Sequence, residues 1–252
     1  MKHLIILVLA AQFSFAQNQM KPEETEVWDP EPAVVQPGVY TAPPSDAIVL
    51  FNGSDFSKWR NERTREKVLW TLNPDKSMTV NPGTGGIETI EDHGSIQLHI
   101  EWKSPTVIKG EGQGRGNSGI LFQRRYEVQV LDSYQNRTYS NGQAGSIYKQ
   151  YIPLVNAMRP TGEWQVYDIV FNAPEFNEAG EEIKPGNFIV FHNGILIQNA
   201  VELQGTTEYI GKPKKGRDVV PGYGSEEAQH RSLMLQDHGD LVSYRNIWMR
   251  KL

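Results

Sequence analysis

The chain of 252 residues contains no cysteine. This absence excludes a disulfide framework, a thiolate metal site, a cysteine nucleophile and a lipid attached to an N-terminal cysteine. Basic side chains are outnumbered, because 25 Lys and Arg stand against 30 Asp and Glu for a formal net charge of −5. Without a basic block, nucleic acid is not expected as a partner. The longest apolar run, residues 4–11, is too short to span a bilayer, so no membrane span is expected.

The first 45 residues differ in composition from the rest of the chain. Lys2 and His3 precede the apolar run, and the small residues Ser14 and Ala16 follow it, which is the pattern of a cleaved signal peptide over residues 1–16. Residues 17–45 are polar and rich in proline, which predicts an extended leader on the surface or without order. We expect a secreted or periplasmic protein whose folded domain covers residues 46–252.

Alternation of apolar and polar residues dominates the remaining sequence. Ile96, Leu98, Ile100 and Trp102 share one face of a predicted strand, and a hairpin signal stands at Asn193-Gly194. No amphipathic helix of ten or more residues is present. Short strands with Gly, Pro and Asn turns predict an all-β antiparallel sandwich or jelly roll. The predicted strands cover residues 95–102, 126–132, 164–171, 188–191, 195–197 and 241–252.

The polar faces of two predicted strands carry unusual side chains. One strand presents His99 and Glu101, and the other presents Glu127 and Gln129, with Tyr126, Val128 and Val130 on its apolar face. If the two strands are neighbours, these groups form one patch that suits hydrogen bonds to sugar hydroxyls or proton transfer. An ordinary solvated sheet face is the alternative.

Two loops supply further candidates. The glycine-rich segment 110–119 lacks Gly-Lys-Ser/Thr and no helix follows it, so it is not a phosphate loop, but Arg115 and Asn117 could contact a ligand at the rim of a cleft. Asp237 next to His238 could orient an imidazole, and Arg245 on the following strand could bind a carboxylate or an oxyanion.

Metal ligation has no clear motif. The six histidines show neither HxH nor HExxH spacing, although a calcium site made of loop oxygens needs no such motif and remains open. Gly-x-Ser-x-Gly, the commonest signal of a serine hydrolase, is absent.

An ordered set of short motifs resembles one secreted bacterial family, the 3-keto-disaccharide hydrolase domain, formerly domain of unknown function 1080. The resemblance covers roughly residues 46–252, and one conservative departure is Ser146, where relatives usually have Ala. The motifs, in chain order, are Leu50-Phe51-Asn52-Gly53 with Trp59, Leu98-His99-Ile100-Glu101-Trp102, Gly116-Asn117-Ser118-Gly119-Ile120, residues 126–133, Gly145-Ser146-Ile147-Tyr148, Asn156-Ala157, Gly162-Glu163-Trp164, Asn193-Gly194, residues 235–239 and Tyr244-Arg245-Asn246-Ile247.

The resemblance implies a concanavalin A-like sandwich of two curved antiparallel sheets with the ligand on the concave face. It places Ile96, Leu98, Ile100, Tyr126, Val128 and Val130 in the core, and His99, Glu101, Glu127 and Gln129 in the cleft. The implied activity is cleavage of glycosides already oxidised at C3.

A mechanism follows as a hypothesis. The C3 ketone acidifies the C2 proton, a base removes it, the aglycone leaves C1 by β-elimination, and water adds back. His238 or Glu127 is the candidate base, oriented by Asp237 or Gln129, and Glu101 is the candidate acid. Arg245 and Asn117, or a divalent ion such as calcium, would stabilise the C3 oxygen. The other expected substrate contacts are His99, Gln129, Gln236 and Tyr148.

Two other functions fit the same sequence. A conventional glycosidase would use Glu101 and Glu127 as two carboxylates about 5–10 Å apart if their strands are neighbours. A non-catalytic, lectin-like module is also compatible, because one fold hosts many functions and the chain has 6 Trp and 10 Tyr that could stack on sugars. By parity, however, Trp102 and Trp248 are expected in the core.

Overall fold

The computed structural model describes residues 20–219 and 231–252. The chain divides into two units, Met1–Val35 and Gln36–Leu252. The predicted signal peptide, residues 1–16, lies outside the described residues. The described part of the first unit contains one short 3-10 turn, η1 (Pro22–Thr25). The second unit contains all the strands of the described residues and also residues 36–45, which belong to the predicted leader.

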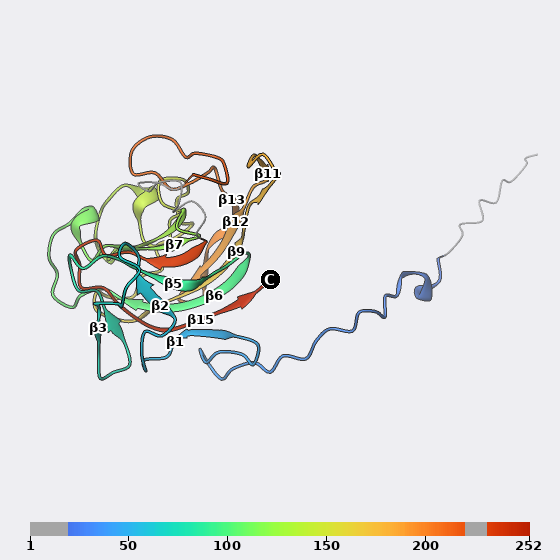
Figure 1. Cartoon of the computed structure of the whole chain (residues 1–252), viewed down its shortest axis with the longest axis horizontal. Coiled ribbons are helices and arrows are strands. Elements are labelled where there is room, and N and C mark those ends of the chain that lie inside the picture. Colours follow the sequence, from blue (N-terminus) through green and yellow to red (C-terminus); the bar gives the residue numbers. More distant parts are fainter. Residues whose placement is uncertain (1–19, 220–230) are drawn as a thin grey trace, which may run out of the picture. The chain divides into compact units, whose positions relative to one another are not determined.

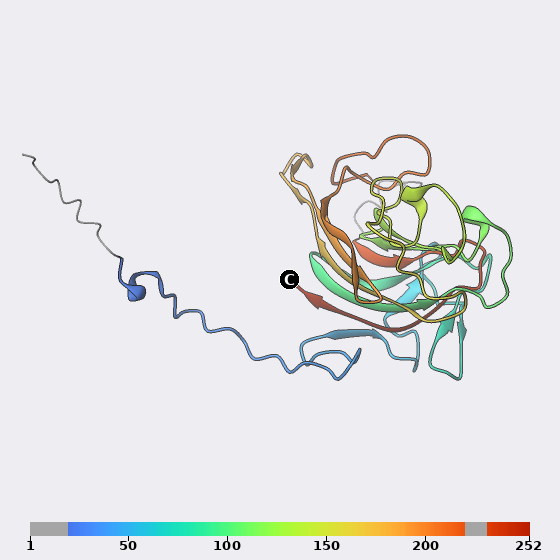
Figure 2. The ribbon, with the colours of Figure 1, turned by 180° about the vertical axis from the view of Figure 1, so that it is seen from behind.

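The larger sheet of the second unit has the strand order β13-β12-β9-β6-β15-β4-β3, with β1 paired to β15. Its pairings are antiparallel, and β6, β9, β12 and β15 are visibly curved (Figures 1 and 2). The strands are β1 (Ile48–Phe51), β3 (Thr71–Leu72), β4 (Met78–Thr79), β6 (Ile96–Lys103), β9 (Gln165–Asn172), β12 (Asn187–His192), β13 (Ile195–Glu202) and β15 (Ser243–Lys251).

The smaller sheet has five strands in the order β2-β5-β14-β7-β8, again antiparallel. They are β2 (Trp59–Asn61), β5 (Ile87–Asp92), β14 (Ser232–Leu235), β7 (Ser118–Phe122) and β8 (Tyr126–Val130). A separate pair, β10 (Glu175–Phe176) and β11 (Glu182–Lys184), and the 3-10 turns η2 (Gly112–Gly114) and η3 (Ser140–Gly142) complete the described elements. The predicted all-β sandwich is confirmed. Within the described residues, no helix is long and apolar enough to cross a membrane.

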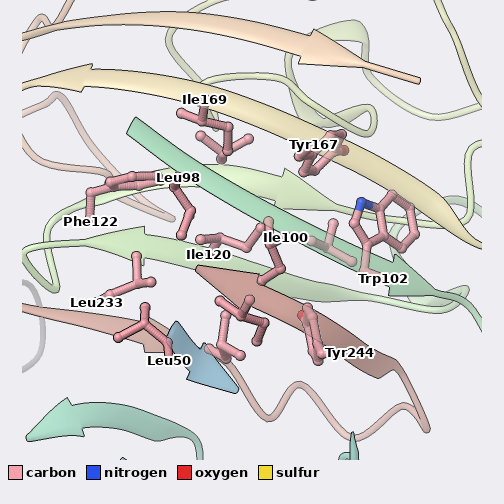
Figure 3. Close-up of a cluster of buried hydrophobic side chains, with 14 of the residues drawn as sticks. Leu50, Leu98, Ile100, Trp102, Ile120, Phe122, Tyr167, Ile169, Leu233 and Tyr244 are labelled. Carbon is pink, nitrogen blue, oxygen red and sulfur yellow. The ribbon is translucent and has the colours of Figure 1, made fainter. Parts of the chain in front are cut away.

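The core lies between the two sheets and follows from the alternation in the sequence. Side chains from β6 and β9 meet those of β7, β14 and β15, among them the labelled Leu98, Ile120 and Tyr244 (Figure 3). The residues predicted to be in the core, Ile96, Leu98, Ile100, Tyr126, Val128 and Val130, all belong to it. Every second side chain of these strands therefore points away from the core, onto the outer face of its own sheet.

The predicted hairpin between β12 and β13 is also confirmed. Asn193 and Gly194 have φ angles of 52° and 80°, the left-handed values that a two-residue type I′ turn requires and that Asn and Gly adopt most easily.

A bulge in β15 changes the parity of that strand. Arg245 pairs with Glu101 but Trp248 pairs with His99, and Asn246 between them has a φ of 46°. The extra residue turns Trp248 to the outer face, where its ring stacks on His99, while Ile247 and Met249 enter the core. The expectation that Trp248 has core parity is therefore wrong, whereas Trp102 is fully buried as expected.

Candidate functional site

The two strands with unusual polar faces lie in different sheets. β6 is in the larger sheet and β8 is at the edge of the smaller one, so the predicted patch that joins His99 and Glu101 to Glu127 and Gln129 is wrong. Alternation determines which residues share a face of one strand, but it does not determine which strands are neighbours. Because both strands turn their apolar side chains to the same core, their polar side chains lie on opposite outer faces of the sandwich.

Glu101 is closed into a network on the outer face of the larger sheet. Its carboxylate accepts hydrogen bonds from Arg245 Nε at 2.6 Å, Asn246 Nδ2 at 2.9 Å and Thr41 Oγ1 at 3.1 Å. Burial alone would raise the pKa of Glu101, but the bonds from His99, Asn246 and Arg245 outweigh it and hold this pKa at about 2. A carboxylate with such a low pKa cannot act as an acid near neutral pH.

His99 and Arg245 belong to the same network. His99 Nδ1 lies 2.6 Å from Asp168 Oδ1, and the hydrogen bonds to Asp168 and Glu101 raise the pKa of His99 although burial opposes this. The Arg245 guanidinium lies 4.1 Å from the centre of the Trp164 ring. The structure thus separates His99, Glu101 and Arg245 from the other predicted site residues.

Those other residues meet in a cavity on the outer face of the five-stranded sheet. Its volume is about 260 Å³, and we call it the Glu127 cavity. Strands β7, β8 and β14 form its floor, because the side chains on their faces away from the core point into it. The predicted residues that line it are Asn117, Glu127, Gln129, Tyr148, Gln236 and His238.

Glu127 is the distinctive group of this cavity. Its side chain is nearly buried, and within the described residues no ion pair reaches its carboxyl group. The carboxyl group lies against Gly119 on the neighbouring strand, where a Cβ atom would stand 2.4 Å from Glu127 Oε1. Burial raises the pKa of Glu127 to about 8. At neutral pH the group is therefore mostly protonated and able to donate a proton.

Amide and phenol groups surround this acid. Gln129 Nε2 donates to Gln113 Oε1 at 3.0 Å, and among the described residues Gln129 Oε1 is buried without a hydrogen-bond donor. Asn117 Nδ2 donates to the carbonyl of Gln113 at 2.7 Å. The hydroxyls of Tyr148 and Tyr139 share a hydrogen bond of 2.6 Å, and burial raises the pKa of Tyr148 well above its usual range. Such neutral polar groups suit the hydroxyls of a sugar.

His238 is exposed at the edge of the cavity, but Asp237 does not orient it. The Asp237 carboxylate accepts backbone N–H bonds from Gly83 at 2.8 Å, Gly85 at 3.0 Å and Gly239 at 3.0 Å. Asp237 therefore fixes the loop at Gly83–Gly85 next to its own turn. The expected Asp237–His238 pairing is wrong, since among the described residues every hydrogen bond to this carboxylate comes from a backbone N–H.

Six lining residues were not predicted as site residues. They are Leu121, Arg124, Arg125, Thr207, Tyr209 and Met234. Two arginines come from the tight β7–β8 turn, where Gln123 and Arg124 have φ angles of 51° and 60°. Arg124 pairs with Glu88 at 2.5 Å, and burial, together with Arg231 and Arg124, lowers the pKa of Arg125 to about 10. Two adjacent arginines between two predicted strands were the only feature of the sequence that could have indicated arginine in the lining of this cavity.

Metal ligands do not gather in the described part of the chain. No group of three or more His, Asp or Glu side chains is placed there to hold an ion. Among residues 20–219 and 231–252, a divalent ion at the C3 oxygen therefore has no cluster of carboxylate and imidazole ligands, whereas a calcium site made of loop oxygens stays a prediction.

Comparison with protein families decides the relationship. The model of the 3-keto-alpha-glucoside-1,2-lyase-like domain matches residues 46–250. The chain belongs to this family. The resemblance found in the sequence motifs is thereby confirmed.

Solved structures agree with this assignment. A candidate glycosyl hydrolase from Parabacteroides distasonis ATCC 8503 is 46% identical, with a TM-score of 0.82 over 92% of this chain and 97% of that one. A second candidate glycosyl hydrolase from the same organism is 22% identical, with a TM-score of 0.55 over 82% and 94% of the two chains, and shows the same fold. Comparison with curated protein sequences finds no match.

Proposed function

We propose that this protein is an enzyme that cleaves glycosides oxidised at C3, and that the reaction takes place in the Glu127 cavity. The observation that carries the proposal is a buried carboxyl group with a pKa of about 8, without an ion-pair partner among the described residues, which shares a cavity with an exposed imidazole. Two titratable groups in such different environments suit opposite roles in proton transfer. Family membership supports glycoside cleavage.

The first step removes a proton from carbon. The neutral imidazole of His238 takes the proton from C2 of the sugar, and the electron pair of that C–H bond moves toward the C3 carbonyl to give an enolate. His238 is exposed at the edge of the cavity, so it can approach a sugar that enters from solvent.

The second step breaks the glycosidic bond. The enolate electrons form the C1=C2 double bond, the C1–O bond breaks, and Glu127 gives its proton to the departing oxygen. Water then adds to the unsaturated sugar: its hydroxide bonds to C1 while Glu127 takes its proton, and the protonated His238 returns a proton to C2, so both groups regain their starting states. The net reaction is hydrolysis without an oxocarbenium ion.

Positive charge is needed where the enolate oxygen develops. Arg245 cannot supply it, because it is bound to Glu101 on the other outer face. Arg124 is likewise bound to a carboxylate, Glu88, so the proposed source is Arg125, which lines the Glu127 cavity and whose guanidinium donates to the backbone carbonyls of Gln123 and Val219. The amides of Asn117 and Gln129 would orient the sugar hydroxyls.

The test compares a 3-keto-α-glucoside with the unoxidised α-glucoside, both with the same aglycone, in D2O. We expect release of the aglycone from the keto compound alone, and deuterium at C2 of the recovered sugar. Cleavage of the unoxidised compound without deuterium at C2 would support a conventional glycosidase. Binding of sugar with no turnover after long incubation would support the lectin-like alternative.

The conventional glycosidase cannot use the pair that the sequence suggested. Glu101 and Glu127 lie on opposite outer faces of the sandwich, so they cannot flank one glycosidic bond.

The N-terminal residues bear on where in the cell the enzyme acts. We propose that residues 1–16 are removed on export and that the enzyme works outside the cytoplasm, as the charged start, apolar run and small residues before Gln17 suggest. N-terminal sequencing of the protein from a periplasmic or culture fraction should begin at Gln17. A start at Met1 in the cytoplasmic fraction would contradict it.

A further inference from the structure

A larger cavity adjoins the proposed sugar site. It has a volume of about 570 Å³, and we call it the Leu241 cavity after one residue of its wall. The volume is in the range of sites that hold a drug-sized molecule. Its wall includes Lys103, Val107, Ile108, Lys109, Asp240 and Leu241.

Two chain segments separate the cavities and line both of them. In the first segment, Gly116 lines the Leu241 cavity and the next residue, Asn117, lines the Glu127 cavity. In the second segment, His238 lines the Glu127 cavity and the next residue, Gly239, lines the Leu241 cavity. The Asn117 N–H donates to Asp240 Oδ2 at 2.8 Å and so ties the segments together. A molecule that occupies both cavities would cross this wall next to His238, where the proposed mechanism breaks a bond.

The chemistry of the two cavities differs. Val107, Ile108 and Leu241 remain 67%, 55% and 51% exposed, so apolar side chains stand open on the wall of the Leu241 cavity. The amides and phenols that suit sugar hydroxyls are in the Glu127 cavity instead. An exposed apolar wall suits a flat hydrocarbon surface better than a second sugar.

The charged groups of the Leu241 cavity favour an anion. Arg115 and Asp132 neutralise each other at 2.8 Å. The other charged lining residues are Lys103, Lys109 and Asp240, and the Asp240 carboxylate already accepts the Asn117 N–H. The Lys103 ammonium lies 4.7 Å from the centre of the ring of Trp164, which does not line this cavity, so Lys109 is the cation considered for a ligand. Lys109 beside an apolar wall, with the Asp240 carboxylate already bonded to Asn117, matches a ring with a carboxylate.

We propose that the Leu241 cavity is the aglycone subsite and that it takes an aromatic aglycone carrying a carboxylate. The inference rests on the proposed function, because it takes the Glu127 cavity as the sugar site. The aromatic ring would pack on Val107, Ile108 and Leu241, and Lys109 would face the carboxylate.

Turnover of three 3-keto-α-glucosides tests the subsite. Their aglycones are 4-carboxyphenyl, phenyl and a second glucose. For L241S, we expect the preference in kcat/KM for 4-carboxyphenyl over glucose to fall about tenfold, as for the loss of one apolar contact. For K109Q, we expect the preference for 4-carboxyphenyl over phenyl to fall several-fold. I183S, which removes a 63% exposed apolar side chain from β11, is the matched control and should leave both preferences as in the wild type.

A binding measurement separates this inference from the proposed function. Calorimetric titration with 4-hydroxybenzoate, the free aglycone, requires no turnover, and we expect weaker binding to L241S and K109Q than to the wild type or I183S. If no 3-keto-glucoside is cleaved but this pattern of binding holds, the subsite stands and the proposed function fails. If 3-keto-glucosides are cleaved and both preferences are unchanged in L241S and K109Q, the subsite is overturned.

Discussion

Glu101 and Glu127 have the same sequence context and nearly the same burial, but their carboxyl groups differ in protonation state at neutral pH. Each lies on the polar face of an alternating strand, and they are 5% and 6% exposed. Glu101 has donors from three side chains and a pKa of about 2, whereas Glu127 has no ion pair within the described residues and a pKa of about 8. Partners, more than burial, determine whether a buried carboxyl group is a structural anion or a proton donor.

The difference comes from what covers each outer face. Above Glu101, the bulge at Asn246 and the segment that carries Thr41 bring donors to the carboxylate. Above Glu127, the segments that carry Tyr148 and Thr207 leave a cavity, and the Thr207 hydroxyl accepts the backbone N–H of Glu127 and leaves its carboxyl group alone.

The largest expected difference is in turnover. E127Q should lower kcat for a 3-keto-α-glucoside by roughly 10²–10⁴-fold, because the acid for the departing oxygen is lost. E101Q should keep most of the turnover and instead lose about 1–3 kcal/mol of unfolding free energy, since the partly exposed Arg245 and its neighbours lose a charged acceptor. Steady-state kinetics and urea unfolding of both variants measure the contrast. Equal losses of turnover in E127Q and E101Q would contradict the proposed difference between the two carboxyl groups.

His238 should separate from its neighbour Asp237 in the same way. H238Q should lower turnover by roughly 10²-fold or more through loss of the base, with little effect on stability, because the side chain is exposed. D237N should mainly lower the unfolding free energy, because it weakens the acceptor of three backbone N–H groups. A stable D237N enzyme that is as inactive as H238Q would contradict this assignment of roles.

Gly119 tests the position of the Glu127 carboxyl group without changing its chemistry. In G119A the new methyl group would meet Glu127 Oε1 at 2.4 Å, so the carboxyl group must move, and we expect a loss of about 10-fold or more in kcat. G94A is the control, because nothing lies within 4 Å of its added Cβ. The test is kcat for both variants beside circular dichroism. Unchanged turnover in G119A would show that this carboxyl position does not matter.

The smallest effect is a difference in the pH dependence of stability. Folded Glu127 keeps its proton up to about pH 8, whereas an unfolded Glu loses it near 4.5, so its contribution falls as the pH rises between these values, by about 1.4 kcal/mol per pH unit. E127Q should therefore gain stability relative to the wild type from pH 5 to pH 8.

Glu101 should behave in the opposite sense. Its contribution is present above pH 4.5 and is lost as the pH falls toward 2, where the folded carboxylate takes up a proton. Urea midpoints of wild type, E127Q and E101Q across pH 3–8 measure both slopes. Parallel curves for all three proteins would contradict the two pKa shifts.

Sequence predicts the strands and the core here because alternation is a local property. Ile96, Leu98 and Ile100 show which side of β6 is buried without any knowledge of its neighbours. The pairing of strands is not local, so Glu101 was wrongly expected to share one face of the sandwich with Glu127. The bulge at Asn246 also depends on pairing with β6, so alternation alone placed Trp248 in the core by mistake.

The candidate site was predictable only in part. Glu127, Gln129, Tyr148 and His238 meet in one cavity, and they were found through alternation and through the family motifs. Arg124 and Arg125 were missed because charged residues in a turn usually face solvent, whereas the tight β7–β8 turn buries both of them.

Thr41 links the stretch before the first strand to the far side of the sandwich. Its hydroxyl donates to Glu101, and its carbonyl accepts from Asn246 Nδ2 at 2.9 Å and Trp248 Nε1 at 3.1 Å. A recombinant protein trimmed to start at Asp46, where the family match begins, would lose this clasp and leave an indole and a carboxylate uncovered. The shortest chain that keeps these contacts should therefore include Thr41 and begin upstream of Asp46.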